Sequence, residues 1–139
     1  APARELPDEL LMGLDYLTPN ESELQLLSGQ RTGTGEEVDC AAQTLLDKGV
    51  QNVIVTVGHM GAYIKNRELS MHVPAVDARA IDTVAAGDSF NGALAVYLSE
   101  GHSLVDACEF ANKVGAITVT REGAIASLPY RHEIQEGEA

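Results

Sequence analysis

The sequence has few cationic residues. Its 139 residues include 9 Lys and Arg against 21 Asp and Glu, which gives a net charge of −12 at pH 7. Proteins that bind duplex nucleic acid normally carry a basic stripe, and an acidic surface is repelled by anionic lipids. We therefore expect neither a nucleic-acid partner nor a membrane partner.

Cysteine is scarce as well, because Cys40 and Cys108 are the two cysteines of the sequence. The pair does not have the C-x-x-C spacing of a zinc or redox site. Both cysteines fall in expected helices among apolar neighbours. This pattern favours two buried thiols in a reducing compartment over a disulfide or a metal site, and it indicates a cytoplasmic protein.

Long apolar runs, internal repeats and low-complexity linkers are also missing from the sequence. No apolar run is long enough to span a membrane. Residues 1–5 contain neither a methionine nor an apolar signal region, so we expect a chain that is processed, truncated or a fragment. The length fits one domain, and a composition of 45% hydrophobic and 22% charged residues is that of a soluble globular protein.

Hydrophobic patterning predicts helices that alternate with strands. Residues 52–57 are a continuous β-branched run, which is typical of a strand buried on both faces. Longer helices are expected at 38–48, 88–98 and 104–119, shorter helices at 7–12 and 20–27, a strand at 15–18, a candidate hairpin at 61–66 and 69–74, and a polar, frayed tail from Arg131. This order indicates an α/β fold with a parallel or mixed sheet, and the small number of strands suggests an absent front half.

The segment Asp82–Ala93 carries the densest chemical signal. Ala85, Ala86 and Gly87 lead into a helix and would let backbone N–H groups approach a ligand, as in phosphate sites at helix N-termini. Asp88 lies in the first turn, where an ionised aspartate can accept a proton from an attacking hydroxyl. The structural alternative is that Asp88 merely caps the helix.

Two further segments precede helices or follow strands. In Thr18–Glu23, Asn20 and Glu23 have the spacing of a capping box, and the functional alternative directs Asn20 toward phosphate and Glu23 toward Mg²⁺ through water. In Thr56–Gly61, two glycines after a buried strand indicate either a hairpin loop or space for a ligand's phosphate or adenosine. The four scattered histidines are assigned to no metal.

Together these segments resemble the ribokinase-like (PfkB) sugar kinases. Asp82–Gly92 is similar to the family's D-T-x-G/A-A-G-D-x-F signature, and Leu17–Glu23 to its T-P-N-E-x-E motif. Ile54–Gly61 is similar to its strand-Thr-x-Gly-x-x-Gly motif, and Ala116–Ala124 to its closing A-x-x-x-x-T-R-x-G-A. Pro2–Leu11 resembles a segment that follows a sheet strand. The resemblance covers nearly the whole chain but only the C-terminal half of the family's length.

The resemblance implies a role for each matching residue. Asp88 would be the catalytic base beside the sugar, and Glu23 would lie near Mg²⁺ through water. The backbone N–H groups of Ala85, Ala86 and Gly87 would form the anion hole. The nucleotide would contact Asn20, Thr56, Val57, Gly58, His59, Met60, Gly61, Gly87 and Asn112. Potassium would be held by Asp82, Val84, Thr118, Arg121, Gly123 and Ser127, several of them through backbone oxygens. Ala85 stands where many members of the family have glycine.

The implied fold is a three-layer α/β/α sandwich, of which residues 1–139 are the C-terminal nucleotide-binding and catalytic half with a truncated, mostly parallel sheet. The implied reaction is ATP-dependent phosphorylation of D-ribose to ribose 5-phosphate, with Mg²⁺ and K⁺. Fructokinase, deoxyribose kinase and nucleoside kinase activities stay open, as does a non-catalytic nucleotide-binding module. The isolated fragment is expected to be inactive, and the full-length protein to be a homodimer through the missing lid.

Overall fold

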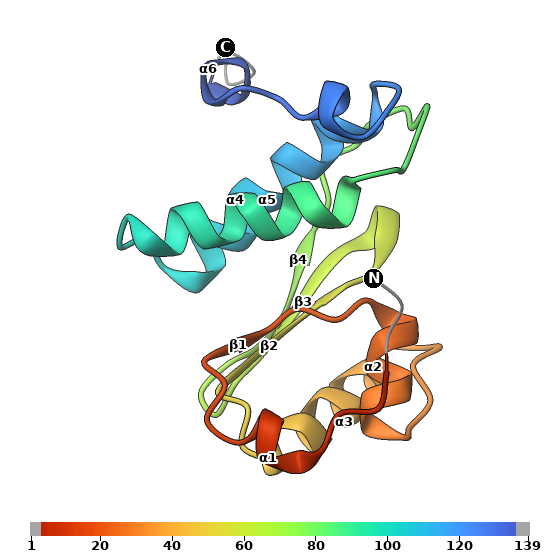
Figure 1. The fold of residues 1–139 in the computed structure, drawn as a ribbon, viewed down its shortest axis with the longest axis vertical. Helices are drawn as coiled ribbons and strands as arrows, with labels where there is room; N and C mark the ends of the chain where they lie inside the picture. The colour runs from red at the N-terminus through yellow and green to blue at the C-terminus, as the bar shows by residue number, and fades with distance from the viewer. Residues whose placement is uncertain (1–3, 136–139) are drawn as a thin grey trace. The chain divides into compact units, whose positions relative to one another are not determined.

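The structure, a computed structural model, describes residues 4–135 and falls into two compact units, residues 1–72 and 73–139, which are described separately (Figure 1). The start of the expected Pro2–Leu11 segment and the last four residues of the tail lie outside the described residues. In chain order the elements are α1 (Asp8–Leu11), β1 (Tyr16–Leu17), α2 (Glu21–Ser28), α3 (Gly35–Asp47), β2 (Asn52–Thr56), the 3-10 helix η1 (Gly58–Met60), β3 (Gly61–Lys65), β4 (Ser70–Pro74), α4 (Ala86–Ser99), α5 (Leu104–Val119), the 3-10 helix η2 (Ile125–Ser127) and α6 (Arg131–Gln135).

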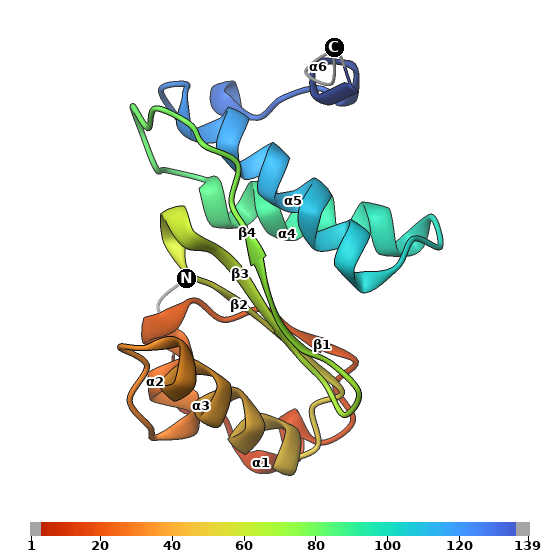
Figure 2. The same cartoon turned by 180° about the vertical axis from the view of Figure 1, so that it is seen from behind.

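Within the described residues, the strands form one four-stranded sheet in the order β1-β2-β3-β4 (Figure 2). β1 runs parallel to β2, with Tyr16 opposite Asn52, whereas β2 runs antiparallel to β3, with Val53 opposite Lys65. The sheet is therefore mixed, and the expectation of a mostly parallel sheet is wrong for the described strands. The reason is the connection: η1 is too short for the crossover that a parallel pair needs, so β3 must return antiparallel.

The hydrophobic core of the first unit lies where helices cover the sheet. Val53, Ile54 and Val55 of β2 are fully buried, which confirms the strand that was predicted to be buried on both faces. α3 contacts both β2 and β3, and α2 contacts β2. The buried members of this core are Leu11, Leu24, Val38, Ala41, Ala42, Leu45, Val50, Val53, Val55 and Val57.

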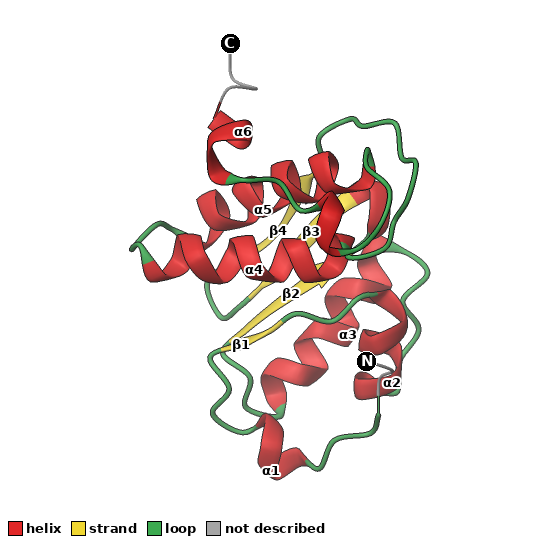
Figure 3. Cartoon of the chain, turned by 45° about the horizontal axis from the view of Figure 1, so that its top comes forward, coloured by secondary structure: helices red, strands yellow, loops and turns green. Residues whose placement is uncertain are grey.

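The second unit is built on a pair of helices, α4 and α5, which lie side by side (Figure 3). Phe90 and Leu94 of α4 are buried, as is Ala111 of α5. The rings of Tyr97 and Phe110 stack with their centroids 3.9 Å apart. Both helices begin and end close to the expected bounds, because their apolar spacing is sustained over three to four turns.

Two further sequence expectations are wrong. Arg131–Gln135 is the helix α6 rather than frayed tail: Arg131 forms an ion pair with Glu100, at 2.8 Å for Nη2 to Oε2, and Ile134 is buried. Cys40 is exposed rather than buried, because Val38, Ala41, Ala42 and Leu45 give α3 an inward face that leaves Cys40 outside. Within the described residues, no helix has the length and apolar character to cross a membrane.

Candidate active site

The N-terminus of α4 has an unusual backbone. Its N-cap residue, Ala85, lies in the left-handed region with φ 64° and ψ 4°, and among the described residues it is the one non-glycine with positive φ. Such a conformation costs an L-residue about 1–2 kcal/mol, and it turns the chain sharply into the helix. The small residues that were expected to open this helix therefore form a strained entry to it.

No side chain caps α4. The Ala86 N–H donates to the Thr83 carbonyl at 3.2 Å, so this member of the expected anion hole already has a partner. Gly87 and Asp88 follow in the first turn, where N–H groups have no intrahelical acceptor. A Cβ on Gly87 would meet nothing within 4 Å. The space where a Gly87 side chain would stand is thus open, and it adjoins the positive end of the helix dipole, where anions bind favourably.

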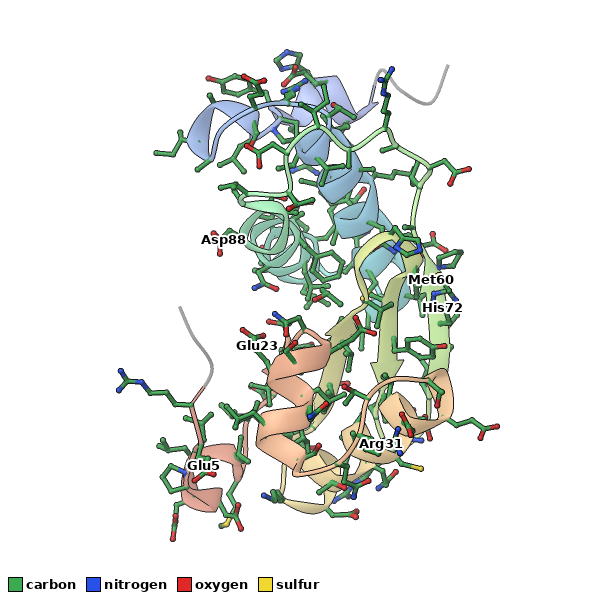
Figure 4. All side chains as sticks on the ribbon, turned by 90° about the vertical axis from the view of Figure 1, so that its right-hand side faces the viewer. Glu5, Glu23, Arg31, Met60, His72 and Asp88 are labelled. Carbon is green, nitrogen blue, oxygen red and sulfur yellow. The ribbon has the colours of Figure 1, made fainter. Side chains whose placement is uncertain are left out.

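Asp88 is the third residue of α4, and its side chain is exposed (Figure 4). It accepts no capping hydrogen bond, so the alternative that Asp88 merely caps the helix is wrong. A cavity of about 400 Å³ adjoins it, lined mainly by apolar side chains of α4, α5, residues 124–129 and α6, among them Val96, Ile125 and Leu128. Sequence reasoning missed this cavity because its walls come from four separate segments.

Asp82 closes the loop that leads into α4. Its Oδ1 accepts the Val84 N–H at 2.9 Å, and its Oδ2 accepts the Gly123 N–H at 3.0 Å. These N–H groups, Val84 first, hold the pKa of the Asp82 carboxyl below its ordinary value. The structure thus brings together three residues of the expected potassium set, with the carboxylate bound to backbone amides.

The other residues of that set have side chains with partners nearby. The buried hydroxyls of Thr118 and Ser127 donate to the carbonyls of Val114 and Ala124, at 2.9 and 2.7 Å. The Arg121 guanidinium binds Glu133 of α6 at 2.7 Å. A potassium site formed by these residues stays a prediction.

In the first unit, the expected nucleotide residues gather where the parallel strands end. Asn20 follows β1 and forms an isolated parallel bridge with Thr56, the last residue of β2. The Thr56 N–H donates to the Pro19 carbonyl at 3.0 Å. Ligands of open α/β sheets bind outside the carboxyl ends of parallel strands, so this is the expected edge for a nucleotide.

The capping box at the start of α2 is present. Asn20 Oδ1 accepts the Glu23 N–H at 2.9 Å, and Glu23 Oε2 accepts the Asn20 N–H at 2.9 Å. This confirms the structural interpretation of the motif, and it leaves the functional one open. The box occupies one oxygen of each side chain, so the Asn20 amide NH₂ still offers donors and Glu23 Oε1 still offers an acceptor.

The residues after β2 form a tight loop around η1. The Val57 N–H donates to the Gly61 carbonyl at 2.9 Å, and the Met60 N–H donates to the Val57 carbonyl at 3.1 Å. Gly58 and Gly61 have φ values of 57° and 101°, which few other residues adopt. A Cβ on Gly58 would meet nothing within 4 Å, so one side of this loop is open.

Asn112 has a structural role on α5. The side chain is buried, and its Nδ2 donates to the carbonyls of Val73 and Pro74 at 3.1 and 3.0 Å. Its expected approach to adenine stays a prediction. Among residues 4–135, no three His, Cys, Asp or Glu side chains gather in a way that could hold a metal ion.

Comparison with known proteins gives the family. Residues 1–131 match the model of the pfkB family carbohydrate kinases. The chain is 39% identical over 137 residues to a ribokinase of Staphylococcus aureus, covering 98% of this chain and 45% of the relative. It is 38% identical over 137 residues to a deoxyribokinase of Salmonella typhi, with 98% and 45% covered.

A solved structure has the same fold. Arabidopsis thaliana ribokinase, solved in complex with ribose and ATP, superposes with a TM-score of 0.92 at 33% identity, covering 96% of this chain and 43% of that protein. The chain therefore spans less than half the length of the relatives it matches. The α/β fold of this chain is ribokinase-like, and the chain belongs to the pfkB family of carbohydrate kinases.

Proposed function

We propose that the protein carrying this chain is a sugar kinase that transfers the γ-phosphoryl group of ATP to D-ribose and forms ribose 5-phosphate. The observation that carries the proposal is Asp88, an exposed aspartate in the uncapped first turn of α4, directly after the strained Ala85. Membership of the carbohydrate kinase family supports the reaction type. The names of the relatives support a pentose acceptor.

In the proposed reaction Asp88 is the general base. Its carboxylate accepts the proton of the sugar hydroxyl, whose oxygen forms a bond to the γ-phosphorus while the bond to the ADP oxygen breaks. Phosphoryl transfer needs little covalent help from a protein, so positioning and charge stabilisation supply most of the rate. The N–H groups of Gly87 and Ala85, with the helix dipole behind them, would stabilise the charge on the transferring group.

The nucleotide half of the proposal rests on the edge of the sheet in the first unit. The free amide NH₂ of Asn20 would donate to phosphate oxygens, and the open side of the Thr56–Gly61 loop would accept the nucleotide. Magnesium usually keeps several waters and binds through one or two carboxylates plus substrate phosphates. Glu23 fits that pattern, since Oε1 is left over by the capping box and would hold a water of the ion. The ion itself would neutralise charge on the phosphates.

Potassium is a further part of the proposal. The loop closed by Asp82 and Gly123 offers hydroxyl and backbone oxygens, which suit this ion. A bound cation would order the loop that precedes α4 and so support the anion hole. Replacing K⁺ by tetramethylammonium at constant ionic strength should lower kcat, while unchanged kinetics would count against a cation at this loop.

Deoxyribose is the second candidate acceptor, favoured by the deoxyribokinase among the relatives. The two acceptors differ by one hydroxyl, and a site that hydrogen-bonds that hydroxyl rejects the analogue strongly. Comparison of kcat/KM for the two sugars decides between them.

Homodimerisation through a lid outside this chain is proposed as well, and light scattering of the native protein tests it.

The decisive experiment compares Asp88→Asn with Asp106→Asn in the native protein that carries this chain. Asp106 is a matched control, because it is also exposed and also the third residue of a helix, α5. A general base typically contributes about 10²–10⁴-fold to the rate, so kcat of Asp88→Asn should fall by that factor. Asp106→Asn should stay within about twofold of the parent, as surface changes usually do. Equal activity in both variants would favour a non-catalytic nucleotide-binding module.

A further inference from the structure

His72 of β4 is bound to the end of η1. Its Nε2 lies 2.5 Å from the carbonyl oxygen of Met60, and Figure 4 shows the two labelled residues next to each other. A carbonyl oxygen only accepts hydrogen bonds, so Nε2 must carry the hydrogen. The neutral Nε2–H tautomer and the imidazolium both donate, and the contact is therefore independent of the charge on the ring.

The imidazole is held in place by its neighbour on β3. The rings of Tyr63 and His72 lie with their centroids 4.9 Å apart and tilted by 31°. Both side chains are partly buried. A donor fixed in this way loses little rotamer freedom when it binds its acceptor, and the bond to Met60 is correspondingly effective.

The bond matters because of what it restrains. The Val57 N–H donates to the carbonyl of Gly61, the first residue of β3, and so continues the pairing of β2 with β3, while the Met60 N–H bonds back to the Val57 carbonyl within the loop. The bridge between Asn20 and Thr56 fixes only the start of the loop. His72 reaches the opposite end from β4. Thr56 and Gly61 already belong to β2 and β3, so the bond from His72 adds a tie at Met60, a residue of the loop that lies in neither strand.

We propose that His72 is a positioning residue for the nucleotide loop. It fixes the Met60 carbonyl, so that the loop holds its binding geometry before ATP arrives. A preorganised loop spends less binding free energy on ordering, which improves affinity for the ligand that contacts it. We therefore expect His72 to affect the affinity for ATP and not the affinity for the sugar. The proposal rests on the function proposed above.

Two substitutions test the hydrogen-bond donor and the aromatic ring of His72 separately. His72→Phe keeps an aromatic ring against Tyr63 and removes the donor. His72→Gln removes the ring and retains an amide NH₂ at about the reach of Nε2. If the hydrogen bond matters, His72→Phe should raise KM and Kd for ATP about three- to tenfold, the value of one lost hydrogen bond. The Gln variant should stay within about twofold of the parent, as should kcat and the KM for sugar in both variants.

Ser70→Ala is the matched control, since Ser70 lies two residues before His72 on the same face of β4 and hydrogen-bonds Asp39 of α3 instead. It should leave both KM values unchanged. His72→Leu replaces the Phe variant if that one melts at a much lower temperature. If His72→Gln binds ATP as weakly as His72→Phe, the proposal is overturned, because packing of the ring and not the hydrogen bond would then explain the effect.

Calorimetric titration with ATP–Mg²⁺ accompanies the kinetics. It distinguishes a failure of the proposed kinase function from a failure of the proposed role of His72. If the parent binds ATP without transferring phosphoryl to any sugar, the proposed function is wrong, and the ratio of Kd values still tests His72. If the parent binds no ATP, both are wrong. If the parent is an active kinase and all variants bind ATP equally, only the role of His72 is wrong.

Discussion

The carboxylate of Asp82 joins two segments of the second unit that lie 41 residues apart, because its Oδ2 accepts the N–H of Gly123. Gly123 has φ 91°, a value that residues with a Cβ rarely adopt. The same carboxylate accepts the N–H of Val84, which lies two residues before Ala86, the first residue of α4, and one before its N-cap, Ala85. The loop before α4 and the loop after α5 are therefore fixed to each other by one side chain.

Asp82→Asn should weaken this junction. Asparagine keeps one acceptor oxygen and places an NH₂ group against the second backbone N–H, so one of the two bonds is lost. We expect a lower melting temperature and a lower kcat, with the KM for ATP little changed. Differential scanning calorimetry and steady-state kinetics measure the two effects. Unchanged kcat in a folded variant would contradict a link between this loop and the anion hole.

The same carboxylate predicts a pH dependence. Its pKa is held below the ordinary value of 3.8, first by the Val84 N–H and then by the Gly123 N–H. A carboxyl with a depressed folded-state pKa stabilises the protein above its unfolded pKa, and this contribution is lost as pH falls through the folded value. Stability from this group should therefore be complete above about pH 5 and decline below 3.8. The Asn variant should lack that part of the acid transition.

Gly87→Ala should separate stability from activity. A Cβ at this position meets nothing within 4 Å, and alanine is the better helix residue, so stability should stay equal or rise by up to about 1 kcal/mol. The same methyl group would occupy the space in which a phosphoryl group is proposed to sit. We expect kcat to fall at least about tenfold. Urea denaturation and a coupled ADP assay measure the two quantities.

Gly115→Ala in α5 is the matched control for that prediction, because a Cβ at Gly115 also meets nothing within 4 Å. It should gain similar stability without loss of activity. If the Gly87→Ala enzyme is as active as the Gly115→Ala enzyme, the proposed anion hole at the N-terminus of α4 is contradicted.

Asn112→Leu should destabilise the fold. The amide that donates to Val73 and Pro74 would be lost at nearly constant volume, leaving carbonyls without their donor. The expected cost is about 1–3 kcal/mol in the free energy of unfolding, measured by urea denaturation. A variant of unchanged stability with a raised KM for ATP would instead support the expected contact of Asn112 with adenine.

The two cysteines should react very differently with iodoacetamide. Cys40 is exposed, whereas Cys108 is buried, and burial raises the pKa of its thiol to about 12. The thiolate is the reactive form, so the Cys108 peptide should stay unmodified in native protein at pH 8 and react after unfolding. Peptide mass spectrometry reports both sites. Equal modification of the two peptides would mean that α5 opens readily.

Much of this fold could be predicted because its signals are local. The β-branched run of β2, the apolar spacing of α5 and the capping box of Asn20 and Glu23 each depend on residues within a few positions of one another. Family motifs added expected roles, such as that of Asp88, which composition and spacing could not supply.

Other features depend on distant residues and escaped prediction. Helix α6 is stabilised by Arg131 with Glu100 and by Arg121 with Glu133, pairs that no local pattern reveals. The contact between His72 and Met60 also needs the β3–β4 hairpin to bring two strands together. The exposure of Cys40 follows from which face of α3 meets the sheet.

The sequence alone determined most of the helices and strands, the capping box of α2 and the family that the chain resembles, because dihedral preferences and hydrophobic periodicity act over a few residues. The tertiary structure alone decided which hydrogen-bonding groups remain available: Ala86 donates its N–H to the Thr83 carbonyl, while the capping box leaves Asn20 its NH₂. Whether a polar group is free for a ligand depends on every neighbour that folding brings to it, and those neighbours come from the whole chain.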